Sequence, residues 1–188
     1  MSLDWSTLSD GELALLSVAG RQAAFAQIMQ RYRQSVFRLV RAFTGDPEEA
    51  MDLAQETFVS AHQALARYDE DRPMKAWLST IALNKCRDWS RKRAVRRFLS
   101  FAGPLEGDAE RVPDDQVAID DAAADRQELD RVTRAIATLP ANLKEALVLR
   151  TIEGLTQAET AEVLSISEKS VETRLYRARA KLQEKLAY

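Results

Sequence analysis

Residues 155–182 read Leu-Thr-Gln-Ala-Glu-Thr-Ala-Glu-Val-Leu-Ser-Ile-Ser-Glu-Lys-Ser-Val-Glu-Thr-Arg-Leu-Tyr-Arg-Ala-Arg-Ala-Lys-Leu. Within this stretch Thr156 is followed three residues later by Glu159, the capping-box pattern that begins a helix. Ser165-Ile166-Ser167 interrupts the helical period, and Ser167 can cap a second helix. The stretch therefore predicts two short helices joined by a tight turn, which is the sequence form of a helix-turn-helix.

The second of these helices has two unlike faces. Val171, Leu175, Ala178 and Leu182 recur at helical spacing and predict an apolar face that packs inward. The opposite face carries long polar side chains, which a helix lying in a major groove needs in order to read base edges. We favour DNA binding over the alternative, an amphipathic surface helix with ordinary solvated charges. The candidate reading residues are Lys169, Glu172, Thr173, Tyr176 and Arg177.

Composition narrows the class of protein. With 188 residues, 46% of them hydrophobic and 30% charged, the chain can form one large or two small domains with a buried core. It has no apolar run of about 18 residues and no secretory signal pattern, so we expect a cytoplasmic protein. A single cysteine, Cys86, and a single histidine, His62, cannot supply a disulfide or a zinc site. We expect no metal and no cofactor.

The net charge of −2 conceals a strong pattern. Residues 84–97 carry seven Lys or Arg, and residues 169–185 carry six. Between these basic stretches, residues 98–125 hold eight acidic residues and one basic residue, Arg111. Basic stripes attract phosphate backbones, whereas an acidic segment would avoid DNA and suit a basic protein channel. The alternative, equally open from charge alone, is that the acidic segment is simply a soluble linker.

The other start and stop signals along the chain all indicate helices. Ser9 with Glu12 forms a second capping box, Gly45 ends an apolar stripe that begins at Phe25, and Asp46-Pro47 begins another helix, expected to reach about Tyr68. A polar loop at 69–73 precedes a helix expected from Met74 to about Arg93. Strand patterns are absent from the sequence.

Gly103, Pro104, Gly107 and Pro113 mark a break between two helical regions. We predict an all-α fold with two small helical domains, at residues 1–97 and 125–188, on a flexible acidic linker over 98–124.

Two polar faces lie in the first domain. Asn84, Arg87 and Arg91 recur along one side of the helix from Met74, as expected for contacts to duplex DNA or to an exposed strand. Asp52, Gln55 and Glu56 share one face of the preceding helix, while Leu53 and Phe58 point inward. Taken alone, that second face is an ordinary solvated surface. We expect Trp77, Trp89 and Cys86 to serve packing, and His62 to be a surface or half-buried residue without a functional role.

Three segments in this order resemble the bacterial sigma-70 family. Asp52-Leu-Ala-Gln-Glu-Thr-Phe58 resembles the segment that docks on the clamp helices of core RNA polymerase. Ala76 to Asp88, Ala-Trp-Leu-Ser-Thr-Ile-Ala-Leu-Asn-Lys-Cys-Arg-Asp, resembles the region that binds the promoter −10 element. Leu139-Pro140, Glu145 to Arg150 and Glu153 to Glu159 resemble the domain that binds the −35 element. The two-domain size resembles the extracytoplasmic-function (ECF) subgroup.

The resemblance implies a sigma factor that recruits core polymerase and performs no catalysis. It implies promoter DNA, the polymerase clamp and flap, and an anti-sigma factor as partners, with the flap meeting the helix around Leu143 to Arg150. It assigns Asp52, Gln55, Glu56 and Thr57 to the clamp, and Lys169, Glu172, Thr173, Tyr176 and Arg177 to the −35 element. It assigns Arg67, Asp69, Arg72, Asn84, Lys85, Arg87 and Arg91 to the −10 element.

The sequence departs from the family pattern at two positions. Ser165 stands in the turn where the family often has glycine, which implies a small conformational cost. Glu172 on the reading face would repel phosphate unless it accepts from a cytosine amino group.

Three other classes of protein fit the sequence less well. A decoy that titrates an anti-sigma factor would not keep the basic side chains Arg87, Arg91 and Arg177. A plain two-domain repressor would leave the segment 52–58 unexplained. A nuclease would need carboxylates on a rigid frame, but the candidates lie in or beside the linker, namely Asp114, Asp115, Asp120 and Asp121.

Overall fold

The computed structural model describes residues 4–101 and 121–187, and all regular structure in these two ranges is helical. The first range contains α1 (Asp10–Val18), α2 (Gln22–Thr44), α3 (Pro47–Ala64), the short 3-10 helix η1 (Leu65–Arg67) and α4 (Met74–Phe101). The second contains α5 (Asp121–Ala137), α6 (Ala141–Thr151), α7 (Gln157–Leu164) and α8 (Glu168–Leu186). The all-α prediction is confirmed.

Local sequence signals set the helix ends. Ser9 and Glu12 form the predicted capping box, and the left-handed Gly45 (φ 73°) ends α2. Asp46 accepts from the backbone amides of Glu48 and Glu49 and thereby caps α3, with Pro47 at its first position. The helix that was expected to reach Tyr68 becomes the tighter η1 after Ala64.

Helix α4 is longer than the expected end at about Arg93, since it continues to Phe101. Residues 94–101 contain no glycine or proline, and the first breakers are Gly103 and Pro104. The segment 98–124 is therefore helical at both ends, and the rest of the predicted flexible linker, 102–120, lies outside the described residues.

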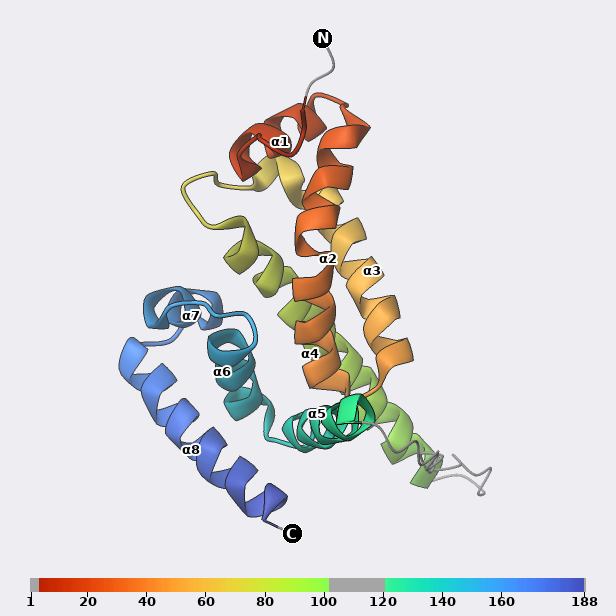
Figure 1. Cartoon of the computed structure of the whole chain (residues 1–188), viewed down its shortest axis with the longest axis vertical. Helices are drawn as coiled ribbons and strands as arrows, with labels where there is room; N and C mark the ends of the chain where they lie inside the picture. Colours follow the sequence, from red (N-terminus) through yellow and green to blue (C-terminus); the bar gives the residue numbers. More distant parts are fainter. Residues whose placement is uncertain (1–3, 102–120, 188) are drawn as a thin grey trace.

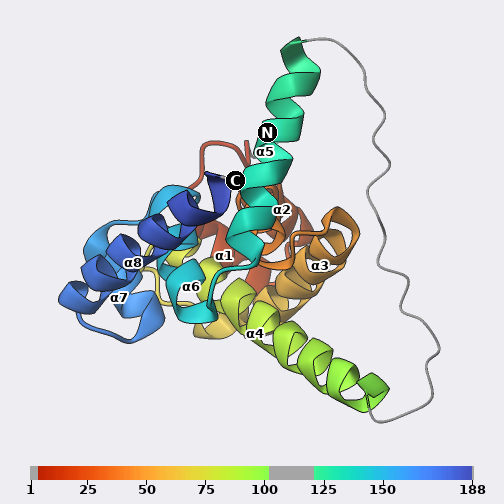
Figure 2. The ribbon, with the colours of Figure 1, turned by 90° about the horizontal axis from the view of Figure 1, so that it is seen from below.

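In the first helical unit α2, α3 and α4 pack along one another, while α1 covers one end (Figure 1). The core between them is aliphatic and aromatic, and its fully buried members include Ile28, Leu39, Leu78 and Leu83. Figure 2 shows that the last turns of α4 and the first turns of α5 project away from the packed body.

The second unit packs directly on the first. Helix α5 lies against α2, α7 lies against α4, and α6 lies between α8 and α2 (Figures 1 and 2). The side chains from Leu143 to Leu149 are consequently all buried. The two units that the sequence predicts are therefore in contact in this structure, because α5, α6 and α7 pack against α2 and α4.

Candidate nucleic-acid and protein interface

Helices α7 and α8 form the expected helix-turn-helix. Thr156 and Glu159 cap α7 reciprocally, and the Ser167 side chain accepts from the Ser170 amide to cap α8. Ser165 in the turn is the one non-glycine residue with positive φ (54°) in the described backbone. Its left-handed geometry lets the following Ile166 amide donate back to the Ala161 carbonyl at 2.9 Å, which closes the end of α7 together with the bond from the Ser165 amide to the Glu162 carbonyl.

The outer face of α8 is free for contact. Val171, Leu175 and Ala178 are buried against the rest of the unit, so the other side of the helix faces outward. Tyr176 is 76% exposed. The Thr173 hydroxyl donates to the Lys169 carbonyl, which fixes its rotamer on the helix surface. All five residues expected to read DNA are exposed: Lys169, Glu172, Thr173, Tyr176 and Arg177.

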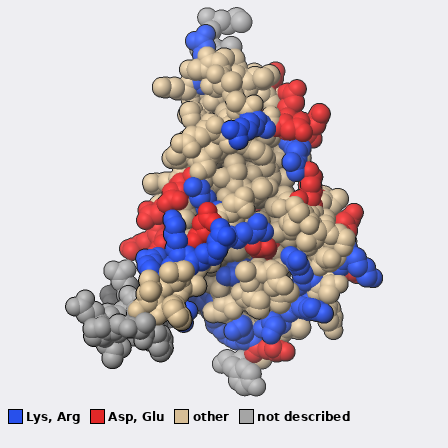
Figure 3. All heavy atoms as spheres, turned by 180° about the vertical axis from the view of Figure 1, so that it is seen from behind, with Lys and Arg blue, Asp and Glu red and all other residues tan. Residues whose placement is uncertain are grey.

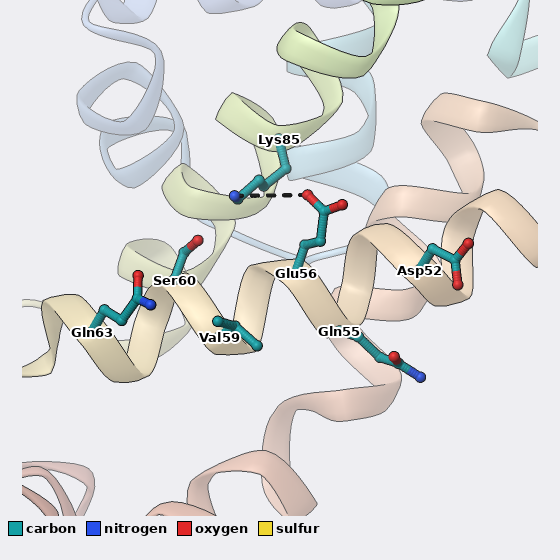
Figure 4. Close-up of a pocket in the computed structure, with 7 residues that line it drawn as sticks. All are labelled: Asp52, Gln55, Glu56, Val59, Ser60, Gln63 and Lys85. Atoms are coloured by element: carbon teal, nitrogen blue, oxygen red, sulfur yellow. Dashed lines mark ion pairs between the residues drawn. The ribbon is translucent and has the colours of Figure 1, made fainter.

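The α3 face contains three of its four expected residues. Asp52, Gln55 and Glu56 are exposed and line a shallow groove with Val59, Ser60, Gln63 and Lys85. Figure 4 shows Glu56 turned toward Lys85 of α4, with 3.8 Å between carboxylate and ammonium, while Gln55 projects from the other side of α3. Lys85, expected at the −10 element, is thus engaged with a residue expected at the polymerase clamp.

Thr57 does not belong to that surface. Its side chain is fully buried, and its hydroxyl donates to the Leu53 carbonyl at 2.7 Å. The structure therefore argues against direct contact of Thr57 with a partner, because its position in the α3 period turns it toward the core.

Sequence reasoning overlooked an apolar neighbour of the α3 face. Met29, Met51 and Val59 are exposed, and a second groove beside them is lined by Phe25, Met29, Phe58 and His62, among others. Val59 borders both grooves. Two methionines at surface positions of amphipathic helices were the available signal, since flexible thioethers suit protein-binding surfaces. His62 packs edge-on against Phe25 at this exposed position.

The polar residues of α4 differ in their exposure and in their partners. Asn84 and Arg91 are exposed, and Arg91 pairs with Asp88 within the helix. Arg87 instead reaches across to α6 and donates two hydrogen bonds to Glu145. Glu145 raises the pKa of the Arg87 guanidinium through these bonds, so its charge is fixed. Of the three residues expected on one face of α4, Asn84 and Arg91 are thus exposed, whereas Arg87 is half-buried and bonded to Glu145.

One residue of the loop before α4 also contacts the second unit. Arg67 and Asp69 are exposed, and the Asp69 carboxylate accepts from the Asp71 amide at 3.1 Å, which shapes the loop. Arg72 pairs with Glu162 of α7. The Tyr68 ring lies 5.2 Å from that of Trp77, so Trp77 serves packing as expected.

Trp89 and Cys86 are packing residues as well. The Trp89 indole donates to Glu49 at 2.8 Å and supports Arg93 on its ring. Cys86 is fully buried, and burial raises the pKa of its thiol to about 12. The thiol is thus a small apolar side chain at neutral pH.

Basic side chains gather over the lower half of one face of the molecule, in which the C-terminal parts of α4 and α8 lie (Figure 3). The C-terminal part of α4 contains five basic residues, all of them exposed: Arg91, Lys92, Arg93, Arg96 and Arg97. Such a field attracts phosphate backbones at long range.

Family models match both units. The Sigma-70 region 2 model matches residues 28–96, and the Sigma-70 region 4 model matches residues 129–182. The chain belongs to the sigma-70 family. It is a sigma factor of the ECF group, which binds core RNA polymerase and directs it to promoters.

Relatives support this assignment along nearly the whole chain. The chain is 43% identical to the RNA polymerase sigma factor CnrH of Cupriavidus metallidurans, covering 93% of this chain and 92% of CnrH. It is 33% identical to the ECF sigma factor SigM of Mycobacterium tuberculosis, covering 96% and 86%.

Solved structures share the fold. The structure of CnrH in complex with the cytosolic domain of CnrY superposes with a TM-score of 0.70, at 35% identity, over 95% of this chain and 97% of that one. The sigma factor RpoE in complex with the anti-sigma factor NepR, from Bartonella quintana, gives a TM-score of 0.67 over 87% and 96%, at 24% identity, and supports the fold alone.

The described residues contain neither a cluster of metal ligands nor a membrane-spanning helix. Among residues 4–101 and 121–187, no group of three or more His, Cys, Asp or Glu side chains could hold a metal ion. No helix in the same ranges is long and apolar enough to cross a membrane. The acids considered for a nuclease, Asp114, Asp115, Asp120 and Asp121, lie outside the side chains that the structure describes.

Proposed function

We propose that this sigma factor divides its contacts between the two helical units. Residues 1–97 would bind the polymerase clamp and the −10 element, and residues 125–188 would bind the −35 element. The acidic segment 98–124 would connect the two units and would suit a basic channel of the polymerase. We further propose that the protein acts in the cytoplasm, where core polymerase and promoters are found.

The −35 contact would be made by the outer face of α8. The observation that carries it is that Lys169, Glu172, Thr173, Tyr176 and Arg177 are all exposed on the second helix of a helix-turn-helix. Their donors and acceptors can reach base edges when the helix lies in a major groove. Arg177 would read a guanine or hold a phosphate, and Glu172 would accept from a cytosine amino group.

The polymerase contact would be made by α3 and its neighbour α2. Exposed acidic and amide groups at Asp52, Gln55 and Glu56 adjoin an apolar strip, in which Met29 of α2 and Val59 of α3 line one groove. An apolar centre with a polar rim is the usual anatomy of a protein interface. Thr57 would contribute through the stability of α3 and not through contact.

The −10 contact would use Arg67, Asp69 and Arg72 of the loop together with Asn84, Lys85, Arg87 and Arg91 of α4. The loop offers polar groups around the Tyr68–Trp77 pair, which suits a base turned out of the duplex. Helix α4 would follow the backbone with its arginines.

We also propose control by an anti-sigma factor. The similar CnrH was solved with the cytosolic domain of CnrY, and the similarity extends over both units of this chain. A partner covering the α2–α3 apolar strip would compete directly with polymerase. Such a factor, when anchored in a membrane, would hold this protein at the membrane without insertion.

Run-off transcription on a pooled library of randomised promoters, with purified bacterial core polymerase, tests the proposal. Transcripts that share −35 and −10 motifs only when the protein is present would support it. A protein that binds core polymerase but yields no enriched motif would contradict the promoter-reading assignments. A protein that binds neither core polymerase nor DNA, but binds an anti-sigma factor, would be the decoy.

A further inference from the structure

The loop proposed to meet the −10 element, residues 69–73, is in contact with α1. It follows η1, which packs against α1, and leads from there to α4 (Figure 1). A shallow groove lies between the loop and α1: residues 9–11 line it from the start of α1, and Glu70 and Asp71 line it from the loop. We call residues 69–73 the −10 loop. The start of α1 is therefore the support against which the −10 loop lies.

Glu70 of the −10 loop packs closely across Gly11 of α1. A Cβ atom at Gly11 would lie 2.9 Å from a Glu70 carboxylate oxygen and 3.2 Å from the Glu70 Cβ. Both distances are shorter than favourable contact between such atoms. Gly11 lies within the helix and is not among the residues with positive φ, so its backbone conformation does not require glycine. The close approach of Glu70 does.

Electrostatics favours Glu70 in this place. The first backbone amides of a helix have no partners within the helix and are partly positive, so a carboxylate beside them is stabilised. Gly11 is the second residue of α1, and the Glu70 carboxylate therefore lies beside that first turn. A side chain at position 11 would separate the carboxylate from these amides.

The first turn of α1 is itself fixed to α2. The Arg31 guanidinium of α2 donates to the Asp10 carboxylate at 2.9 Å. It also donates to the carbonyls of Ser6 and Leu8, at 2.9 and 2.6 Å. The Tyr32 hydroxyl donates to the second Asp10 oxygen at 2.5 Å. Because two side chains of α2 bind both Asp10 oxygens, the start of α1 cannot easily move to accommodate a shift of the −10 loop.

Tyr68 connects this support to the polar groups proposed to receive an unpaired base. Its hydroxyl donates to the Arg72 carbonyl at 2.7 Å, which joins the two ends of the −10 loop. Burial, followed by the carboxylates of Asp10 and Asp69, raises the pKa of Tyr68 to about 12. The phenol therefore stays protonated and keeps this hydrogen bond at neutral pH. A loop pushed away from α1 would pull on the same residue.

We propose that Gly11 is a positioning residue for promoter opening: by admitting Glu70 against the first turn of α1, it sets the place of the −10 loop. This inference rests on the proposed function, which assigns the −10 loop to the promoter. Gly11 acts through Glu70 and needs no contact of its own with DNA or polymerase.

Gly11→Leu is the informative variant. The leucine side chain would take the space of Glu70 and displace the −10 loop, whereas its helix propensity exceeds that of glycine. We therefore expect unchanged helical content by circular dichroism. Affinity for core polymerase should also be unchanged, because Gly11 does not line the grooves beside α3. Val18→Leu is the matched control, an enlargement at an exposed position of α1 outside the groove.

Binding of a single-stranded oligonucleotide measures the effect on the promoter. The oligonucleotide carries the non-template −10 sequence recovered from the promoter library, and fluorescence anisotropy follows its binding to the complex of the full chain with core polymerase. We expect Gly11→Leu to weaken this binding several-fold and Val18→Leu to leave it unchanged. Wild-type affinity in Gly11→Leu would overturn the inference.

Glu70→Ala separates positioning from a general loss of stability. With Glu70 truncated, Gly11→Leu should weaken oligonucleotide binding little further, because the two side chains no longer compete for one space. The two substitutions are thus expected to be strongly non-additive. An equal loss from Gly11→Leu in the presence and in the absence of the Glu70 side chain would contradict action through Glu70.

Nuclear magnetic resonance of the free full chain follows the loop without DNA. The backbone amide signals of residues 69–73 should shift in Gly11→Leu and stay in place in Val18→Leu. Unshifted signals in Gly11→Leu would overturn the inference. Failure of the proposed function differs: the wild-type complex would not bind the −10 oligonucleotide, and the amide signals would still decide whether Gly11 positions the loop.

Discussion

Arg87 and Glu145 are 58 residues apart in the sequence and form a two-pronged ion pair across the boundary between the two helical units. Glu145 is almost wholly buried, with a side chain 8% exposed, whereas 40% of the Arg87 side chain remains accessible. Removing Arg87 would leave a buried carboxylate unpaired, which is strongly unfavourable. The pair therefore makes the position of α6 depend on a residue assigned to DNA.

The α3 surface yields the first prediction. Asp52→Lys should abolish or strongly weaken binding to core polymerase, because it reverses an exposed charge at the proposed clamp contact. Glu56→Lys should do the same and in addition repel Lys85. Pull-down or interferometry with core polymerase measures the effect, and circular dichroism verifies the fold.

Thr57→Val is the matched control on the same helix. The buried Thr57 hydroxyl donates to the Leu53 carbonyl. Losing this hydrogen bond should therefore lower the free energy of unfolding and leave polymerase affinity unchanged. Equal polymerase binding by Asp52→Lys and the wild type would remove α3 from the interface.

Promoter reading by α8 yields the second prediction. Arg177→Ala should weaken use of the preferred −35 sequence by about 1–3 kcal/mol if the guanidinium reads a guanine, and by less if it contacts only phosphate. Competitive transcription on promoters that differ at single −35 positions separates these cases. An equal loss on every promoter sequence would exclude base reading by Arg177.

The turn between α7 and α8 yields the third prediction. Ser165 adopts φ 54°, which disfavours any residue with a Cβ, so Ser165→Gly should raise the free energy of unfolding by up to about 1 kcal/mol. Urea denaturation measures this change in the free energy of unfolding. Gly154→Ala is the reverse case: Gly154 has φ 67° with open space around its Cα, so the substitution should destabilise through backbone strain alone. A loss of stability in Ser165→Gly would refute the strain argument.

Glu153 yields a fourth prediction, on pH. Burial raises the pKa of its carboxyl above the ordinary value, and one carboxylate oxygen, Oε1, has no hydrogen-bond partner. A pKa raised on folding stabilises the folded protein at pH values below the unfolded pKa, and this contribution is lost as pH rises through the folded pKa. Ionisation of Glu153 thus weakens the packing of the two units as pH rises above the ordinary carboxyl range.

Comparing Glu153→Gln with the wild type isolates that contribution. The amide keeps the size of the side chain and cannot ionise, so the variant should lose less stability than the wild type between pH 5 and pH 8 in urea denaturation. Identical pH profiles for the two proteins would show that Glu153 carries no net penalty. Glu12→Gln is a suitable control, because Glu12 is an exposed cap whose pKa is lowered.

The sequence alone determined the helices and the orientation of their faces. Capping boxes at Ser9 and Thr156, the glycine stop at Gly45 and the Asp46-Pro47 start are all present where they were expected. The reading face of α8 followed from the same helical period that buries Val171 and Leu175. These features depend on residues within a few turns of one another, so a linear pattern contains them.

Only the tertiary structure decided which polar residues are free. Neither the spacing of Arg87 nor that of Ser35 indicated partners 58 and 118 residues away, at Glu145 and Glu153. The apolar grooves beside α3 likewise need two helices to form. Helical periodicity gives the direction of a side chain relative to its own axis, whereas pairing across units depends on how whole helices pack, and that is set by the summed burial of distant apolar faces.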